Sequence, residues 1–373
     1  MTEERDARMG LAAAHDAGDL GLAKLLAERS VVEVWEYVRS GRGNSTLAHR
    51  AAAVDLTAVA RETAGARARF VIPGDDEWPA ALDDLAWGDP VGGFGGAPVG
   101  LWVSGPARLC DLTAAVAIVG SRASTTYGEH VAADWAAGLA EGGHAIVSGG
   151  AYGIDACAHR GAIAAGGATV AVMAGGLAQF YPPGNSALLQ RVQEIGAVVS
   201  EYPPDRPPSR ARFLVRNRLI AALGKVTVIV EAGVRSGAQN TVSWALALGR
   251  PVLAAPGPVT SAMSHTPHRL IRSGEATLVT SVEEILATLG PVDVSRPEYV
   301  HQQDTLFDTL SAEQRTVHEA MPARGNVSVD ELAMTTGTSV LSLLVSLGHL
   351  KLAGLVDEPS PGLWQLAKPA AHR

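Results

Sequence analysis

The first residues suited to chemistry surround Arg122, in the stretch "AIVGSRASTTYGEH". We expect a strand to end at Gly120 and a helix to begin near Tyr127. The first N–H groups of a helix are free and carry partial positive charge, so a guanidinium beside them favours a phosphate as the ligand. Gly120, Ser121 and Arg122 are therefore candidate anion-binding residues. An ion pair between Arg122 and a surface carboxylate is the alternative.

A second glycine-rich turn occurs in "SGGAYGIDACAHRGA", where a strand again precedes a helix. Its glycines allow a backbone to approach a ligand closely, although the turn is neither a Walker loop nor a strict G-x-G-x-x-G fingerprint. The candidate residues are Ser148, Gly149, Gly150 and Gly153. Asp155 and His159 lie four positions apart on one helix face, a spacing that suits acid–base catalysis. We favour structural roles, with Asp155 in the first helical turn and His159 in a hydrogen bond.

Aromatic residues follow another expected strand in "GGLAQFYPPGNSALL". Tyr181 and Asn185 are candidate ligand contacts, because aromatic rings beside a basic groove suit base stacking. The alternative is that Phe180 belongs to the core and that Tyr181 only forms part of a turn. The local sequence leaves both interpretations open.

Two arginines stand inside an apolar segment, "FLVRNRLIAALG", at residues 213–224. On a helix, Arg216 and Arg218 point about 200° apart, at roughly 100° per residue. We therefore expect one arginine to bind phosphate and the other to pair with an acid such as Glu201 or Glu231. Asn217 is expected to satisfy backbone groups or to meet the ligand, and a purely structural role for all three residues is the alternative.

The stretch "VIVEAGVRSGAQNT" opens one more helix toward the same edge of the expected sheet. Glu231 ends its strand, and Ser236 and Gly237 are candidate contacts in the loop that follows.

These candidates need a sheet to position them, and six apolar runs supply one. The runs "VAIVG", "HAIVSGG", "TVAVMAGG", "AVVSEYP", "VTVIVEAG" and "VLAAPG" do not alternate, which is typical of strands buried on both faces. Segments of helical length separate them. The fold class is therefore α/β, an extended, doubly wound and mostly parallel Rossmann-like sheet, best defined over residues 110–290. Because every run ends in small or polar residues, we expect one long crevice at the carboxyl ends of the strands.

The flanking segments predict further domains. Residues 1–64 have helical spacing and predict an N-terminal helical domain. Residues 65–110 form an irregular lead-in with short strands, "RFVIP" and "GLWVSG", to a sheet domain that spans 65–290. Residues 291–310 predict a linker. Residues 311–373 predict a winged helix, with helices at about 311–321, 328–335 and 338–353 and a hairpin in "GLVDEPSPGLWQL".

The formal net charge of −8 argues against a surface coated in positive charge. Residues 206–225 nevertheless carry six basic side chains and no acid, which indicates a local basic groove. The two cysteines have no metal-ligand spacing and favour a reducing cytoplasm. We expect no metal and no cofactor. Glycines and prolines interrupt the uncharged residues 161–190, so we expect no membrane span there.

Seven stretches, in this order, resemble the DprA/Smf family of DNA-processing proteins over about residues 66–285: "GSRASTTYG", "SGGAYGIDACAH", "GGLAQFYPPGN", "SEYPP", "FLVRNRLIAAL", "VEAGVRSGAQNT" and "GRPVLAAPGPVTS". The resemblance implies a non-catalytic cytoplasmic protein that binds and protects single-stranded DNA. It also implies a homodimer that helps to load the RecA recombinase onto incoming strands during transformation.

The resemblance also assigns residues. The arginine of the family's GSR motif falls on Arg122, and the RNR element falls on Arg216, Asn217 and Arg218. The helical N-terminal domain (SAM-like or helix-hairpin-helix-like) and the winged C-terminal domain match appendages that vary within the family. The chain departs from the family pattern at "SHTPHRLI", where a glycine usually precedes the Leu-Ile pair.

Two enzyme classes are the alternatives. Nucleoside-monophosphate phosphoribohydrolases of the lysine-decarboxylase-like type have a similar sheet, but carry a Pro-Gly-Gly-x-Gly-Thr…Glu signature where this chain reads "EAGVRSGAQNT". A dinucleotide-dependent oxidoreductase would need a glycine fingerprint that is missing here. Residues 311–373 carry five basic and six acidic side chains, so the winged domain is expected to read DNA poorly.

Overall fold

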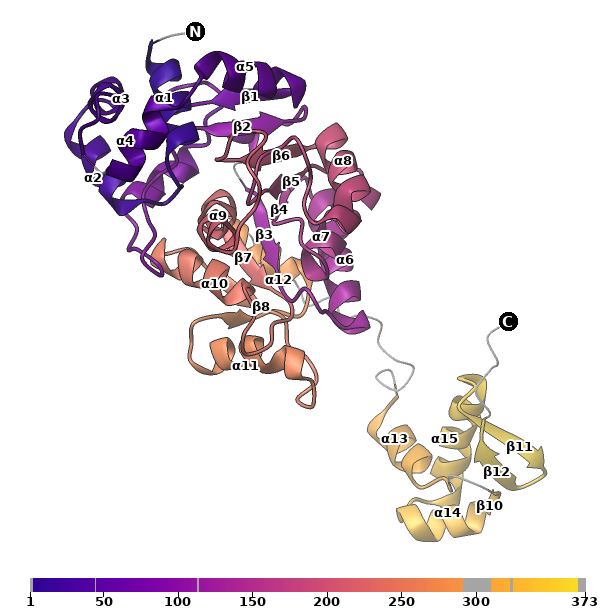
Figure 1. Cartoon of the computed structure of the whole chain (residues 1–373). Coiled ribbons are helices and arrows are strands. Elements are labelled where there is room, and N and C mark those ends of the chain that lie inside the picture. Colours follow the sequence, from indigo (N-terminus) through magenta and orange to yellow (C-terminus); the bar gives the residue numbers. More distant parts are fainter. Residues whose placement is uncertain (1–2, 44, 113, 291–309, 323–324, 368–373) are drawn as a thin grey trace. The chain divides into compact units, whose positions relative to one another are not determined.

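The computed structural model of the chain (Figure 1) describes residues 3–43, 45–112, 114–290, 310–322 and 325–367. The chain divides into two compact units, residues 1–295 and 296–373. The predicted linker, residues 291–310, lies outside the described residues except for Leu310.

A sheet of nine strands forms the centre of the first unit, in the order β1-β2-β6-β5-β4-β3-β7-β8-β9. The strands are β1 (Ala68–Val71), β2 (Leu101–Ser104), β3 (Val116–Val119), β4 (Ile146–Ser148), β5 (Thr169–Val172), β6 (Ala197–Ser200), β7 (Val226–Ile229), β8 (Val252–Ala254) and β9 (Thr277–Leu278). Strands β3 to β9 pair in parallel, and the six predicted runs are all strands, which confirms the α/β prediction. The two short strands of the lead-in extend the sheet, because β1 and β2 join it antiparallel through β6.

Helices cover both faces of this sheet (Figure 1). The helices of the sheet region are α6 (Thr126–Glu141), α7 (Ile154–Ala164), α8 (Ser186–Ile195), α9 (Arg210–Leu223), α10 (Ala238–Ala247), α11 (His265–Arg272) and α12 (Val282–Leu289). Alternate residues of β3 face opposite cores: Val116 and Ile118 pack with α6 and α7, whereas Ala117 and Val119 pack with α9 and α10. The strands are therefore buried on both faces, which explains why their sequences are apolar without alternation.

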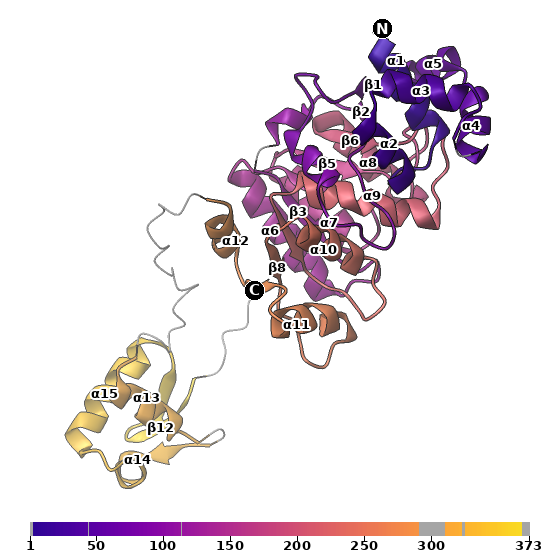
Figure 2. The ribbon, with the colours of Figure 1, turned by 90° about the vertical axis from the view of Figure 1, so that its left-hand side faces the viewer.

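Five helices precede the sheet: α1 (Glu3–Ala14), α2 (Leu20–Glu28), α3 (Val31–Arg39), α4 (Ser45–Ala52) and α5 (Leu56–Gly65). Figures 1 and 2 show them beside β1 and β2. Leu11 and Val34 share one apolar core with Trp102 of β2. Arg206 also donates a 2.6 Å hydrogen bond to the carbonyl of Ala13. These helices belong to the same compact unit as the sheet, and a domain boundary at residue 64 stays a prediction.

The second unit contains α13 (Ala312–Glu319), α14 (Val329–Thr336) and α15 (Val340–Leu352). A small antiparallel sheet accompanies them, with β10 (Val327–Ser328), β11 (Val356–Ser360) and β12 (Leu363–Leu366) in the order β10-β12-β11. Among the described helices none is long and apolar enough to cross a membrane by itself, although α14 and α15, bent by 107°, pass that test of length and composition as a pair.

Candidate nucleic-acid interface

Helix α9 explains how an apolar segment holds two arginines. Ser209 caps its first turn by accepting a hydrogen bond from the backbone N–H of Arg212, and residues 215–223 are all buried. Because the helix already begins at Arg210, Arg216 and Arg218 leave it in different directions, as their spacing predicts.

Arg218 pairs with an acid, which confirms one half of the predicted division of roles. Its two terminal nitrogens donate to the two carboxylate oxygens of Glu201 at 2.7 Å each. The side chains are only 1% and 3% exposed, so this bidentate pair is part of the interior. It joins α9 to the end of β6.

Arg216 is also buried, but no carboxylate binds it directly among the described residues. It donates to the carbonyls of Gly149 and Val172, at the ends of β4 and β5. The pKa of Arg216 is lowered to about 10, chiefly by burial; the charge of Asp155 opposes this shift and the charge of Arg122 adds to it. A Cβ on Gly149 would lie 2.6 Å from the guanidinium, so glycine there makes room for the arginine.

Arg122 lies at the opening of this region and is exposed. Its guanidinium carbon is 4.9 Å from the ring centre of Phe213, and that of Arg216 is 5.7 Å from the same ring. Tyr181, which is 44% exposed, lies 5.7 Å from Phe213 between ring centres. Two guanidinium groups and two aromatic rings therefore gather at one place, which we call the Arg122–Phe213 cluster (Arg122, Tyr181, Phe213, Arg216).

The cluster borders a small hollow, of about 10 Å³, at the ends of β4 and β5. The residues that line it are Gly149, Met173, Ala174, Gly175, Gly176, Gln179, Tyr181, Pro208, Phe213 and Arg216. The lining combines the guanidinium of Arg216 with the rings of Tyr181 and Phe213. Guanidinium groups suit phosphates and aromatic rings suit bases.

Several predicted contacts hold the loops of the cluster in shape. Ser148 is buried and donates a 2.6 Å hydrogen bond to the carbonyl of Ile118. Asn185 is 3% exposed and donates to the carbonyls of Gly150 and Ala151 at 3.0 Å. Gly153 has a φ of 73°, and a Cβ there would lie 2.3 Å from the carbonyl oxygen of Ser121.

The remaining predicted contacts lie in two loops. A Cβ on Gly120 would meet Ile154, and the hydroxyl of Ser121 accepts a 3.1 Å hydrogen bond from the N–H of Ala123. Gly237 is exposed and precedes α10, and the half-buried Ser236 accepts at 3.3 Å from the N–H of Ala238. The structure therefore places all the predicted residues at one edge of the sheet, but gives most of their polar atoms internal partners.

Asn217 connects the two parts of the interface. Its side-chain oxygen accepts from Arg216 at 3.2 Å, and its amide nitrogen donates to Asn240 of α10 at 3.2 Å. Asn217 therefore links the buried arginine to the loop of Ser236 and Gly237.

The structural interpretation of Asp155 and His159 is confirmed. Asp155 lies in the first turn of α7, where it accepts a hydrogen bond from the N–H of Gly149 at 3.1 Å, and burial raises its pKa. His159 is fully buried, with Nδ1 2.7 Å from the hydroxyl of Thr169. Burial, aided by Arg216, lowers the pKa of His159 to about 3.

The expected long crevice is interrupted at two places. Between β3 and β7 the carboxylate of Glu231 fills the gap and binds Thr125, the residue before α6. At the end of β5, the segment 203–208 covers the glycines, since Gly176 and Ala178 donate to the carbonyls of Arg206 and Pro204. The open surface is therefore shorter than the row of strand ends.

Segment "SHTPHRLI", where the chain departs from the family pattern, forms most of α11. His268 accepts a 3.3 Å hydrogen bond from the N–H of Gly257, at the end of β8. This segment therefore also lies at the carboxyl edge of the sheet.

Phe213 is the residue of the Arg122–Phe213 cluster that the sequence reasoning missed. It stands three positions before Arg216, on the same face of α9, and that spacing was the signal that could have identified it.

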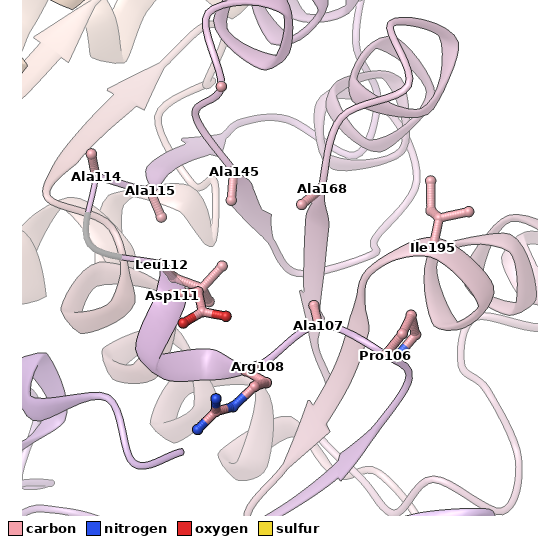
Figure 3. Close-up of a pocket in the computed structure, with 11 residues that line it drawn as sticks. Pro106, Ala107, Arg108, Asp111, Leu112, Ala114, Ala115, Ala145, Ala168 and Ile195 are labelled. Carbon is pink, nitrogen blue, oxygen red and sulfur yellow. The ribbon is translucent and has the colours of Figure 1, made fainter. Parts of the chain in front are cut away.

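A larger hollow, of about 410 Å³ (Figure 3), lies at the amino ends of the strands, beside Ala115, Ala145 and Ala168. It is thus at the opposite edge of the sheet from the cluster.

The sequence and the fold are similar to those of known proteins. The family model described as DNA recombination-mediator protein A matches residues 69–290. A DNA processing protein DprA of Mycobacterium tuberculosis is 45% identical over 364 residues, covering 94% of this chain and 91% of its own. The protein Smf of Escherichia coli is 37% identical over 265 residues, or 69% of each chain.

Two solved structures are also similar. DNA processing protein A of Streptococcus pneumoniae is 31% identical with a TM-score of 0.64, covering 78% of this chain and 99% of that one. The protein from Helicobacter pylori, described by its single-stranded DNA binding mode, is 29% identical with a TM-score of 0.52, covering 60% of this chain and 97% of that one. Because the family model spans more than half of the chain and the mycobacterial relative matches nearly all of it, the chain belongs to the DprA/Smf family of DNA-processing proteins.

Proposed function

We propose that the chain binds single-stranded DNA at the Arg122–Phe213 cluster. The observation that carries this proposal is the exposed Arg122 stacked over Phe213, beside the exposed ring of Tyr181. The guanidinium groups suit phosphates, whereas the rings suit unpaired bases, which only a single strand presents. The Helicobacter pylori relative is described as binding single-stranded DNA, which supports the same ligand here.

The predicted contacts divide by exposure within this proposal. Arg122, Tyr181 and the loop of Ser236 and Gly237 meet the DNA, because they are at least partly open to solvent. Arg216 is buried but lines the hollow. Arg218, Asn217, Asn185 and the glycines of the turns position these groups.

A role in recombination follows from the family, whose model is described as a recombination mediator. The protein protects incoming single strands and promotes RecA loading during transformation, in the cytoplasm and as a homodimer. No step of this role needs a bond to be broken in the DNA, so the protein acts as a binding protein rather than an enzyme.

A nucleotide-cleaving enzyme of the phosphoribohydrolase class is the competing function. It would hold its phosphate at the point where the strand order reverses, between β3 and β7. The carboxylate of Glu231 stands there, and an anion disfavours a second anion. The geometry therefore favours the binding protein.

The two flanking domains complete the proposal. Helices α1 to α5 form the N-terminal helical domain. Helices α13 to α15 with the sheet β10-β12-β11 form a winged helix. Its α15 exposes Leu341 and Leu352, 76% and 88% exposed, and Lys351 is its one lysine or arginine. Such a face is poor at neutralising phosphates, so this domain is not the main DNA reader.

Titration of labelled oligo-dT and of a duplex of equal length tests the proposal. We expect the single strand to bind more tightly, and Arg122→Glu to weaken it sharply. Arg191→Glu, which changes an exposed arginine on α8, is the matched control and should bind like the parent. Normal binding by Arg122→Glu would show that the site is elsewhere. Robust base release from nucleoside monophosphates would favour the enzyme.

A further inference from the structure

The buried carboxylate of Glu231 occupies the N-terminus of helix α6. The backbone N–H of Thr125 donates to Oε2 at 2.9 Å, and the threonine hydroxyl donates to Oε1 at 2.7 Å. The same hydroxyl accepts a 3.3 Å hydrogen bond from the N–H of Gly128, in the first turn of the helix. Glu231 is only 2% exposed. A carboxylate therefore takes the position that a ligand phosphate commonly takes at a helix N-terminus.

The surroundings fit this carboxylate closely. A Cβ on Gly128 would lie 2.3 Å from Oε2 of Glu231, so a larger residue at position 128 would displace the acid. Among the ion pairs of the described residues, none joins Glu231 to a basic side chain. Its charge is therefore balanced by N–H and O–H donors rather than by a counter-ion.

Glu231 also holds both ends of the loop that carries Arg122. The backbone N–H of Ser121 donates to the carbonyl of Glu231 at 2.6 Å, on one side of Arg122. On the other side, Thr125 binds the carboxylate at 2.9 Å and 2.7 Å. The position of Arg122 over the Phe213 ring therefore depends on an acid that itself lies away from the surface.

We infer that Glu231 is a built-in anion with two effects: it positions Arg122 for DNA, and it closes the crevice between β3 and β7 to the phosphates of free nucleotides. This inference rests on the proposed single-stranded DNA binding. Removal of the side chain leaves donors at the start of α6 without an acceptor, and a small external oxyanion can then bind them.

Chemical rescue of Glu231→Ala tests the inference. We expect the variant to melt roughly 5 °C lower than the parent and to bind oligo-dT about tenfold more weakly, because charged hydrogen bonds to the loop are lost. Sodium acetate should restore much of both properties, whereas neutral acetamide with sodium chloride at equal ionic strength should not. Inorganic phosphate should raise the melting temperature of the variant but not that of the parent.

Val230→Ala is the matched control, since Val230 is 1% exposed and directly precedes Glu231, just after strand β7. It creates a cavity without removing charge, so acetate and acetamide should affect it equally. If Glu231→Ala does not fold, Glu231→Gln replaces it: the charge is lost and the volume is kept. That variant should bind oligo-dT more weakly than the parent, with no rescue by acetate because no space is left.

Two outcomes overturn the inference. One is an equal response of Glu231→Ala to acetate and acetamide. The other is an oligo-dT affinity equal to the parent's in whichever Glu231 variant is assayed, Glu231→Ala or its replacement Glu231→Gln. The second outcome is read beside Arg122→Glu in the same assay. If Arg122→Glu binds weakly, only the role of Glu231 fails. If Arg122→Glu binds normally as well, the proposed DNA site fails with it.

Discussion

The guanidinium of Arg122 lies over the ring of Phe213, with 4.9 Å between its central carbon and the ring centre. Arg122 comes from the loop after β3 and Phe213 from the first turns of α9. A cation–π contact uses none of the N–H donors of the arginine, so these donors stay available for a phosphate. The pair therefore provides a phosphate contact and an aromatic surface at one place.

Removal of the charge of Arg122 should change the salt dependence of DNA binding. We expect Arg122→Gln to reduce the slope of log affinity against log salt by about one unit. The variant makes one phosphate contact fewer, so its binding releases fewer counter-ions from the DNA. Anisotropy of labelled oligo-dT across a potassium chloride series measures the slope. An unchanged slope would show that Arg122 touches no phosphate.

Loss of the aromatic surfaces should weaken binding without changing that slope. We expect Tyr181→Ala to cost about 1–3 kcal/mol of binding free energy, the usual contribution of one stacked base. Trp87→Ala is a suitable control, since Trp87 is 90% exposed and lies outside the cluster. Equal affinities of the Tyr181 and Trp87 variants would argue against stacking on Tyr181.

The buried pair of Arg218 and Glu201 should contribute to stability rather than to DNA contact. We expect Arg218→Met to lower the free energy of unfolding by about 3–5 kcal/mol, because Glu201 is left buried without its partner. The double change Arg218→Met with Glu201→Leu should recover much of this loss. Urea unfolding measures both, and a single variant as stable as the parent would contradict the account.

Burial of neutral His159 should make the protein less stable at mildly acidic pH. Its pKa falls from 6.5 to about 3 on folding, so below pH 6.5 the unfolded chain takes up a proton that the folded chain does not. From pH 7.5 to 5.5 this group should remove about 1 kcal/mol of unfolding free energy. We expect His159→Gln to lose stability less steeply over this range in urea unfolding, and parallel curves for variant and parent would exclude the effect.

The second unit should contribute little to DNA binding through α15. Lys351 is the one lysine or arginine on this helix, and it already contacts Glu358 at 3.1 Å and the ring of Trp364. We therefore expect Lys351→Gln to leave oligo-dT and duplex affinities unchanged within about twofold. A clear loss of duplex affinity would instead make α15 a DNA-reading helix.

The strands of the parallel sheet and their alternation with helices could be predicted from the sequence, because burial of a strand on both faces requires a continuous apolar run. The run "VAIVG" is strand β3, and the segment from Tyr127 is helix α6. The same reasoning predicted that Arg216 and Arg218 diverge, because helical geometry fixes the angle between two positions two residues apart.

Other features depended on contacts between residues far apart in the sequence. The short strand "RFVIP" joins the sheet only because β2 pairs with β6, and no local pattern contains that pairing. Phe213 acquires its role only where the loops after β3 and β5 bring Arg122 and Tyr181 to it.

By itself, then, the sequence determined the α/β class, the six parallel strands and the edge at which polar residues collect, because these depend on local periodicity and on the polarity of strand ends. The tertiary structure decided which of these residues face solvent. Glu201 accepts hydrogen bonds from Arg218, and Glu231 accepts hydrogen bonds from Thr125, whereas the guanidinium of Arg122 lies at the surface over the ring of Phe213. The physical reason is that a buried polar group must find a partner, and only the folded chain determines which partner lies within hydrogen-bonding distance.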